Sequence, residues 1–123
     1  MVDKLKAWIP ERRDMIWINF NPQSGKEMKD EHPMLVLSPK VFNEKTGIVI
    51  GLPMTHAKYN ETNPFAIKFL PSKSDPVYIL THQPKSFDWR LRNARPHPWK
   101  ALPPALFQEA CDGLNSIIEI AHQ

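Results

Sequence analysis

Residues able to do acid–base chemistry gather in a polar stretch, residues 21–32, between two apolar runs. The stretch carries Lys26, Glu27, Lys29, Asp30, Glu31 and His32. A carboxylate and an imidazole can share the work of a general acid and base, because the unperturbed histidine pKa is about 6.5. The stretch is longer than two strands need for a connection, so it is predicted to be a functional or a disordered loop.

A second group of chemistry-bearing residues follows later apolar runs. Thr55 and His56 come directly after one run, and His82 follows another. Residues 85–100 then interleave cations with aromatic rings: Lys85, Phe87, Trp89, Arg90, Arg92, Arg95, Trp99 and Lys100. This pattern suits single-stranded RNA, whose phosphates attract cations and whose bases stack on rings. A solvated basic surface around packed aromatics is the alternative.

Metal and thiol chemistry are disfavoured by the pattern. The five histidines are scattered and show no zinc-ligand spacing, so we expect no metal and no cofactor. Cys111 is the single cysteine and is expected to be a small packing residue, not a nucleophile. A chain with one cysteine cannot form an intrachain disulfide, which favours a cytoplasmic protein.

Length, hydropathy and charge limit the number of domains and the kinds of partner that the chain can have. The 123 residues predict a single domain, 1–123, with a modest core. No apolar run is long enough for a membrane span or a signal-peptide core, so we expect no membrane partner and no secretion. The net charge of +3 permits an anionic partner without identifying one.

The secondary structure is predicted to be mainly β. Apolar runs rich in β-branched residues and bounded by Pro, Asn or Gly predict strands at 15–20, 33–39, 47–54, 64–70, 77–80 and 85–89. Residues 38–46 are predicted to be a loop, residues 56–63 and 71–76 to be turns, and the proline-dense residues 96–104 to be an irregular connector.

The last segment changes to helical periodicity. Apolar residues recur every three or four positions: Phe107, Ala110, Leu114, Ile117, Ile118 and Ala121. This spacing predicts an amphipathic helix over 104–122, with Pro104 in its first turn. A small, strongly bent sheet or barrel packed against this C-terminal helix is the simplest architecture.

Several strings, taken in order, resemble the MazF/PemK family of toxin endoribonucleases over nearly the whole chain. They are Trp17-Ile-Asn-Phe-Asn-Pro22, Gly25-Lys-Glu27, His32-Pro-Met-Leu-Val-Leu-Ser-Pro39, Asn43-Glu-Lys-Thr-Gly47, Pro53-Met-Thr55, Asn63-Pro-Phe65 and Gln83-Pro-Lys-Ser-Phe-Asp-Trp-Arg90. The resemblance implies an SH3-like β-barrel with a C-terminal helix, a homodimer, and metal-independent cleavage of single-stranded RNA. It also implies an antitoxin whose acidic tail occupies the RNA groove, and operator DNA binding by the complex.

The resemblance also implies roles for particular residues. Glu27, Thr55, Gln83 and Arg90 match the family pattern, whereas family members carry Arg at the place of His32 and Asp at the place of His82. We hypothesise that His32 is a general acid or base with Glu27 as its counterpart, and that Thr55 contacts the scissile phosphate. His82 is a second acid–base candidate, and Lys26, Gln83, Lys85 and Arg90 are candidate RNA contacts.

Two other interpretations stay open. The chain could bind RNA or an antitoxin without cleaving, because the family arginine is replaced by His32. A generic SH3-like interaction module is weaker, since it leaves the polar loop unexplained. Each candidate residue could also be an ordinary surface group, and His56, His97 and His122 are predicted to be surface residues.

Overall fold

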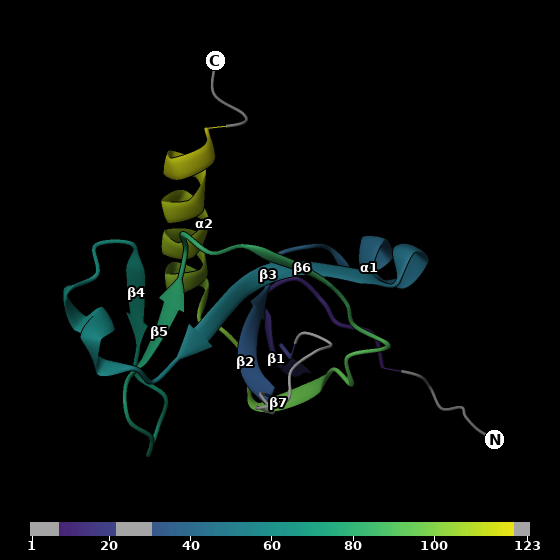
Figure 1. The fold of residues 1–123 in the computed structure, drawn as a ribbon, viewed down its shortest axis with the longest axis horizontal. Helices are drawn as coiled ribbons and strands as arrows, with labels where there is room; N and C mark the ends of the chain where they lie inside the picture. Colours follow the sequence, from purple (N-terminus) through teal and green to yellow (C-terminus); the bar gives the residue numbers. More distant parts are fainter. Residues whose placement is uncertain (1–7, 22–30, 120–123) are drawn as a thin grey trace.

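A computed structural model describes residues 8–21 and 31–119, and Figure 1 shows the fold. The strands are β1 (Asp14–Asn19), β2 (Glu31–Val36), β3 (Ile48–Thr55), β4 (Ala66–Phe69), β5 (Val77–Leu80), β6 (Lys85–Asp88) and β7 (Arg95–Ala101). The helices are α1 (Lys40–Thr46), the 3-10 helix η1 (Lys58–Thr62) and α2 (Pro104–Ile118).

The strands form one antiparallel sheet in the order β4-β5-β3-β2-β1-β7. The long strand β3 is its centre: the first half pairs with β6, and the last residues pair with β5. Figure 1 shows β3 running diagonally across the molecule, so the sheet curls, with α2 standing over one end. The mainly β, barrel-like fold with a C-terminal helix is confirmed.

The strands expected from the apolar runs are present with shifted ends. β1, β3 and β5 begin within one residue of their predicted positions, and the short strand predicted at 85–89 is β6. β2 starts earlier than predicted, at Glu31. His32 therefore lies in a strand and not in the loop, which is a correction to the sequence prediction.

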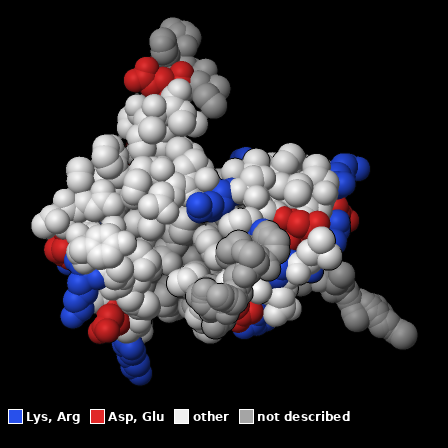
Figure 2. All heavy atoms as spheres, in the orientation of Figure 1, with Lys and Arg blue, Asp and Glu red and all other residues white. Residues whose placement is uncertain are grey.

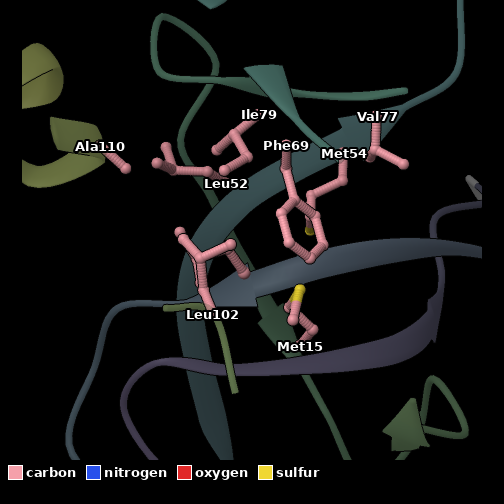
Figure 3. Close-up of a cluster of buried hydrophobic side chains, with 9 residues drawn as sticks. Met15, Leu52, Met54, Phe69, Val77, Ile79, Leu102 and Ala110 are labelled. Atoms are coloured by element: carbon pink, nitrogen blue, oxygen red, sulfur yellow. The ribbon is translucent and has the colours of Figure 1, made fainter. Parts of the chain in front are cut away.

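Alternation of side chains gives the sheet two buried faces. The first core lies between the sheet and α2 and contains Met15, Leu35, Leu52, Met54, Phe69, Val77, Ile79, Leu102 and Ala110. Figure 3 shows the ring of Phe69 close to Met54 and Met15. The second core contains Ile16, Ile18, Met34, Val36, Val49 and Trp89. Consecutive apolar residues of β1 and β2 are therefore buried on both faces of the sheet, and this burial of apolar surface stabilises the two strands.

The helix α2 follows the predicted period over the described residues. Ala110 is fully buried, and Leu106, Phe107 and Leu114 pack against the first core. Ile117 and Ile118 belong to the same predicted stripe but are exposed. The helix extends beyond the sheet at this point, so its last turn has no sheet to cover it (Figure 1). Within the described ranges, no helix has the length and apolar character needed to cross a bilayer.

The prediction of a loop at 38–46 is wrong, because residues 40–46 form α1. This helix has no apolar period and is held by tertiary contacts of Asn43. The buried Asn43 amide donates to the carbonyls of Pro10 and Ser38, and the Asn43 carbonyl accepts from the Trp89 indole N–H at 2.8 Å. Gly47 ends the helix at φ 73°, a left-handed conformation that glycine adopts without strain.

The prediction of an irregular connector at 96–104 is also wrong, because β7 covers residues 95–101. β7 is an edge strand whose only described neighbour is β1. Its other edge forms no strand pairing with the described residues, so the missing N–H groups of Pro96 and Pro98 remove no hydrogen bonds there. Between the pairs Ile16↔Pro96 and Asp14↔Ala101 the register shifts, so β7 has more residues than β1 over this stretch. The irregularity lets a proline-rich segment remain paired at both ends.

His97 corrects a further prediction, since it is buried and not a surface residue. Its ring lies 4.4 Å from the Trp17 ring and 4.0 Å from the Trp99 ring, measured between centroids. Its Nδ1 accepts the Trp99 backbone N–H at 3.1 Å. Burial lowers the pKa of His97, and the nearby His56 lowers it further, so the neutral imidazole is the structural form.

Candidate functional site

The candidate site is the place where β2 and β3 stop pairing and diverge, which we call the fork. The last residues paired between these strands are Met34 and Pro53. Beyond them β2 continues beside β1, and β3 continues to Thr55 beside β5. Figure 1 shows the end of β3 turning away from β2. Past this point β2 keeps its partner β1, whereas β3 pairs with β5 and no longer with β2.

His32 and Thr55 lie at corresponding places on the two sides of the fork. Each is two residues past the last pair, roughly 7 Å along its strand at a rise of about 3.3 Å per residue. Residues two apart share a strand face, so His32 lies on the face of Met34 and Thr55 on the face of Pro53. The structure therefore brings the predicted imidazole and hydroxyl to one face of the sheet.

The His32 ring is exposed but held by aromatic packing. Its centroid lies 5.5 Å from that of Phe20, which in turn lies 4.9 Å from that of Phe87 on β6. The Arg92 guanidinium lies over the Phe87 ring, at 4.3 Å from its centroid. His32 thus ends a row of edge-to-face ring contacts that leads from Phe87, beside the second core, to the surface.

Thr55 is half-buried at the end of β3. Its Oγ1 accepts the backbone N–H of Ala57 at 3.1 Å. Because this oxygen is used as an acceptor, the hydroxyl proton remains to be donated to an anionic oxygen in the fork. A threonine here can therefore orient a phosphate.

Lys85 lies on the same face as the fork. Lys85 is paired with Gly51, and cross-strand partners share a face of the sheet. Every second residue of β3 also points to this face, so Gly51, Pro53 and Thr55 lie on it together. Lys85 is exposed, so its ammonium is available to an anion. Of the predicted RNA contacts within the described residues, Lys85 is the cation that the register aligns with His32 and Thr55.

His82 and Gln83 lie in the turn after β5. Gln83 Nε2 is 3.3 Å from His82 Nε2, and the His82 ring lies 5.8 Å from the Phe65 ring. Both residues are exposed, and within the described residues no hydrogen bond or ring contact joins them to His32. Their predicted roles remain predictions.

Arg90 is held away from the fork. Its Nη2 donates to the Glu44 carbonyl at 2.9 Å, and its guanidinium lies 4.7 Å from the Trp89 ring centroid. A cation at the C-terminal end of α1 complements the helix dipole. These contacts support the position of α1, and RNA binding by Arg90 remains a prediction.

Sequence reasoning missed the roles of two other arginines. Arg92 donates through Nη1 to the carbonyls of Asn19 and Asn21, at 3.1 and 3.2 Å. Arg95 forms a two-pronged ion pair with Glu31, with N···O distances of 2.6 and 2.7 Å. This pairing lowers the pKa of Glu31. Both arginines therefore bind residues at or next to the ends of the predicted loop, residues 21–32. The only sequence signal for these two arginines was their place in the basic stretch.

The basic stretch 85–100 does not form one continuous patch, because its arginines have separate partners. Most of the face seen in Figure 2 is uncharged, and its basic and acidic groups are scattered without forming one patch. Lys26 and Glu27 lie outside the described residues, so their predicted roles are not tested. Within the described ranges, no three His, Cys, Asp or Glu side chains are grouped to hold a metal ion.

Comparison with known proteins decides the family. The family model described as PemK-like, MazF-like toxin of type II toxin-antitoxin system matches residues 11–118. The chain belongs to this toxin family. Endoribonuclease toxin MazF of Escherichia coli K12 is 36% identical to it over 90 residues, covering 73% of this chain and 78% of that protein.

Solved structures of MazF proteins share the fold. MazF in a MazE–MazF crystal structure from Deinococcus radiodurans is 30% identical, with a TM-score of 0.80 over 94% of this chain and 100% of that one. MazF crystallised from the same organism is 28% identical, with a TM-score of 0.79 over 93% and 100%. The family resemblance read from the sequence is thus confirmed, and the curled sheet is the MazF fold.

Proposed function

We propose that this chain is the toxin of a type II toxin-antitoxin system and an endoribonuclease that cleaves single-stranded RNA without a metal ion. The observation that carries the proposal is the fork, where an imidazole, a hydroxyl and an ammonium share one face beside the polar stretch. The relatives named endoribonucleases support the reaction class.

In the proposed reaction the ribose 2′-hydroxyl attacks the adjacent phosphorus. The 2′-oxygen forms the new bond to phosphorus as the bond to the 5′-oxygen breaks, so the products are a 2′,3′-cyclic phosphate and a 5′-hydroxyl. Such a reaction needs a base for the 2′-proton and an acid for the leaving oxygen. We assign these two roles to His32 and Glu27, with His82 as a second acid–base candidate.

The charge that develops on the phosphate also needs stabilisation. Thr55 donates its hydroxyl proton to a phosphate oxygen, and Lys85 supplies positive charge in place of the family arginine. Lys26, Gln83 and Arg90 are proposed to contact other parts of the RNA. The residues that replace the family's Arg and Asp, His32 and His82, are both titratable, which favours this active enzyme over a binding protein that has lost cleavage.

The proposed partners follow from the family. We propose a cognate antitoxin that covers the fork, and binding of operator DNA by the toxin–antitoxin complex in the cytoplasm. We also propose a homodimer, supported by exposed apolar side chains near α1 and at the end of α2: Val41, Ile50, Ile117 and Ile118. Burying Ile118 would remove an exposed apolar side chain from water.

Cleavage of a long single-stranded RNA in EDTA tests the proposal. We expect discrete cuts, mapped by primer extension, that carry 5′-hydroxyl ends. His32→Ala should lower the rate by about 10² to 10⁴, the usual contribution of an acid–base group. Glu109→Ala, at an exposed position on α2, is the matched control and should cut like the parent.

Other outcomes separate the alternatives. Parent-like cleavage by His32→Ala would exclude the acid–base role of His32. Retained RNA or antitoxin binding without any cutting would identify an impaired family member, and a requirement for added metal would contradict the mechanism. His32→Arg, which restores the family residue, tests whether positive charge alone serves at this position.

A further inference from the structure

A pocket of about 290 Å³ opens beside the fork, where β3, η1 and β5 meet. It is lined by His56, Lys58, Glu61, Asp75, Pro76 and Tyr78, and we call it the Tyr78 pocket. Tyr78 is the residue paired with Thr55, and His56 follows Thr55 in the chain. The pocket therefore adjoins the hydroxyl proposed to contact the scissile phosphate. Figure 2 shows acidic and basic side chains intermingled at this end of the molecule, over η1 and the turn between β4 and β5.

The carboxylate of Glu61 is oriented by two neighbours. Oε1 accepts the Tyr78 hydroxyl at 2.5 Å, and Oε2 accepts the Lys68 ammonium at 3.1 Å. Both contacts lower the pKa of Glu61, so the group is an anion at neutral pH. A carboxylate oxygen has more than one lone pair, so each can accept a further hydrogen bond from the pocket.

The other lining groups also favour a planar ligand with hydrogen-bonding edges. His56 Nδ1 lies 3.0 Å from the Pro76 carbonyl, which has no proton to give, so Nδ1 carries the proton. The histidine ring is thereby fixed as a wall on which a flat group can stack. Lys58 adds a donor for a carbonyl oxygen.

The charged groups do not favour a phosphate as the occupant. Two carboxylates, Glu61 and Asp75, line the pocket with the ammonium of Lys58, and the ammonium of Lys68 is already paired with Glu61. A phosphate here would face like charges. A nucleobase has no charge, fits the volume, and can present N–H donors to a carboxylate.

We propose that the Tyr78 pocket binds a guanine base of the RNA next to the cleaved phosphate, with Glu61 as its specificity-determining residue. Guanine presents its N1–H and N2–H donors side by side, which matches the two oxygens of one carboxylate. Adenine and cytosine each present one amino group, and uracil offers one N–H between two carbonyls. The proposal rests on the proposed function, because it places the base beside the scissile phosphate.

Titration with nucleoside monophosphates tests the pocket without requiring cleavage. We expect 5′-GMP to shift the backbone amide resonances of residues 55–62 and 77–79, and to bind more tightly than 5′-UMP. Glu61→Gln keeps the size of the side chain and its acceptor for Tyr78 but removes the charge. It should weaken 5′-GMP binding by about 5- to 150-fold, the range for one bidentate base contact. Glu109→Gln on α2 is the matched control.

Several results would overturn the proposal. They are equal affinity for the four nucleotides, unchanged 5′-GMP binding by Glu61→Gln, or shifts confined to another surface. A lysine- or arginine-containing peptide that binds the pocket when no nucleotide does would indicate a protein partner instead.

A second measurement links the pocket to cleavage. With a randomised RNA library, the wild-type protein should prefer guanine at one position of the cut motif, and Glu61→Gln should lose that preference. A motif unchanged in Glu61→Gln would also overturn the proposal. If the wild-type protein cuts no RNA, the proposed function fails, while the nucleotide titration still decides what the pocket binds.

Discussion

Gly51 offers the sharpest test of how the fork is built. It is paired with Val36, two residues before the fork begins. A Cβ added at Gly51 would lie 2.2 Å from the Leu35 carbonyl oxygen and 2.9 Å from Met34 Cε. The first distance is more than 1 Å short of an ordinary contact, and the atom it meets is backbone. Gly51→Ala therefore has to push β2 and β3 apart.

The expected loss of stability follows from this clash. Overpacking of a filled interior costs about 1–3 kcal/mol. Separating the strands also weakens the adjoining backbone hydrogen bonds, at about 0.5–1.5 kcal/mol each. We expect Gly51→Ala to lower the free energy of unfolding by about 2–4 kcal/mol, a large share of the roughly 5–15 kcal/mol typical of a domain.

Gly113→Ala is the matched control, because the same methyl group is added in a different setting. The atoms nearest to its added Cβ belong to the Thr81 side chain, at 3.2 Å, and Gly113 lies within α2. Alanine is favoured over glycine in a helix by about 1 kcal/mol, which offsets the tight contact. This variant should stay within about 1 kcal/mol of the parent.

Urea unfolding, followed by tryptophan fluorescence at one fixed protein concentration, measures both variants. The concentration is fixed because dimerisation would make the midpoint depend on it. A Gly51→Ala protein with the parent's midpoint and slope would refute the reasoning, because the strands would then separate without cost. Equal losses in Gly51→Ala and Gly113→Ala would show that the effect is not specific to the fork.

Two further predictions concern ionisable groups. Arg95 lowers the pKa of Glu31, so the pair should stabilise the fold above the unfolded carboxyl pKa and lose this effect as pH falls through the folded pKa. Because the pair is partly exposed, a double-mutant cycle with Glu31→Gln and Arg95→Gln should give a coupling of only about 0.2–1 kcal/mol, and a value of zero would show no net pairing. Burial lowers the pKa of His97, so just below pH 6.5 the imidazole becomes protonated in the unfolded chain but not in the folded one. The free energy of unfolding should therefore decrease as the pH is lowered through this range. His97→Phe should flatten that part of the pH–stability curve, and an unchanged curve would assign the dependence to other groups.

Much of the fold was predictable because its signals are local. The apolar runs around Trp17 and Met34 predicted β1 and β2, and the three-to-four spacing from Phe107 to Leu114 predicted α2. α1 was missed because its seven residues depend on hydrogen bonds from Asn43 to distant backbone. β7 was missed because the cost of a proline in a strand depends on whether that strand is at an edge.

The candidate site was predictable only in part. His32, Thr55 and Lys85 were chosen from residue type and family resemblance, and the register aligns them on one face. Arg90 was chosen on the same grounds but binds the end of α1. Composition showed a cluster of cations, but the partner of each arginine depends on how strands distant in the sequence are paired.

By itself the sequence determined the strand and helix periods, the chemical groups available near His32, and the family to which the chain belongs. These features depend on neighbouring residues or on strings read in order. Only the tertiary structure decided that β2 and β3 diverge after Met34 and Pro53, and that Glu61 is oriented by Tyr78 and Lys68. The physical reason is that hydrogen-bonded partners and register are long-range choices, settled when the whole sheet packs its two cores together.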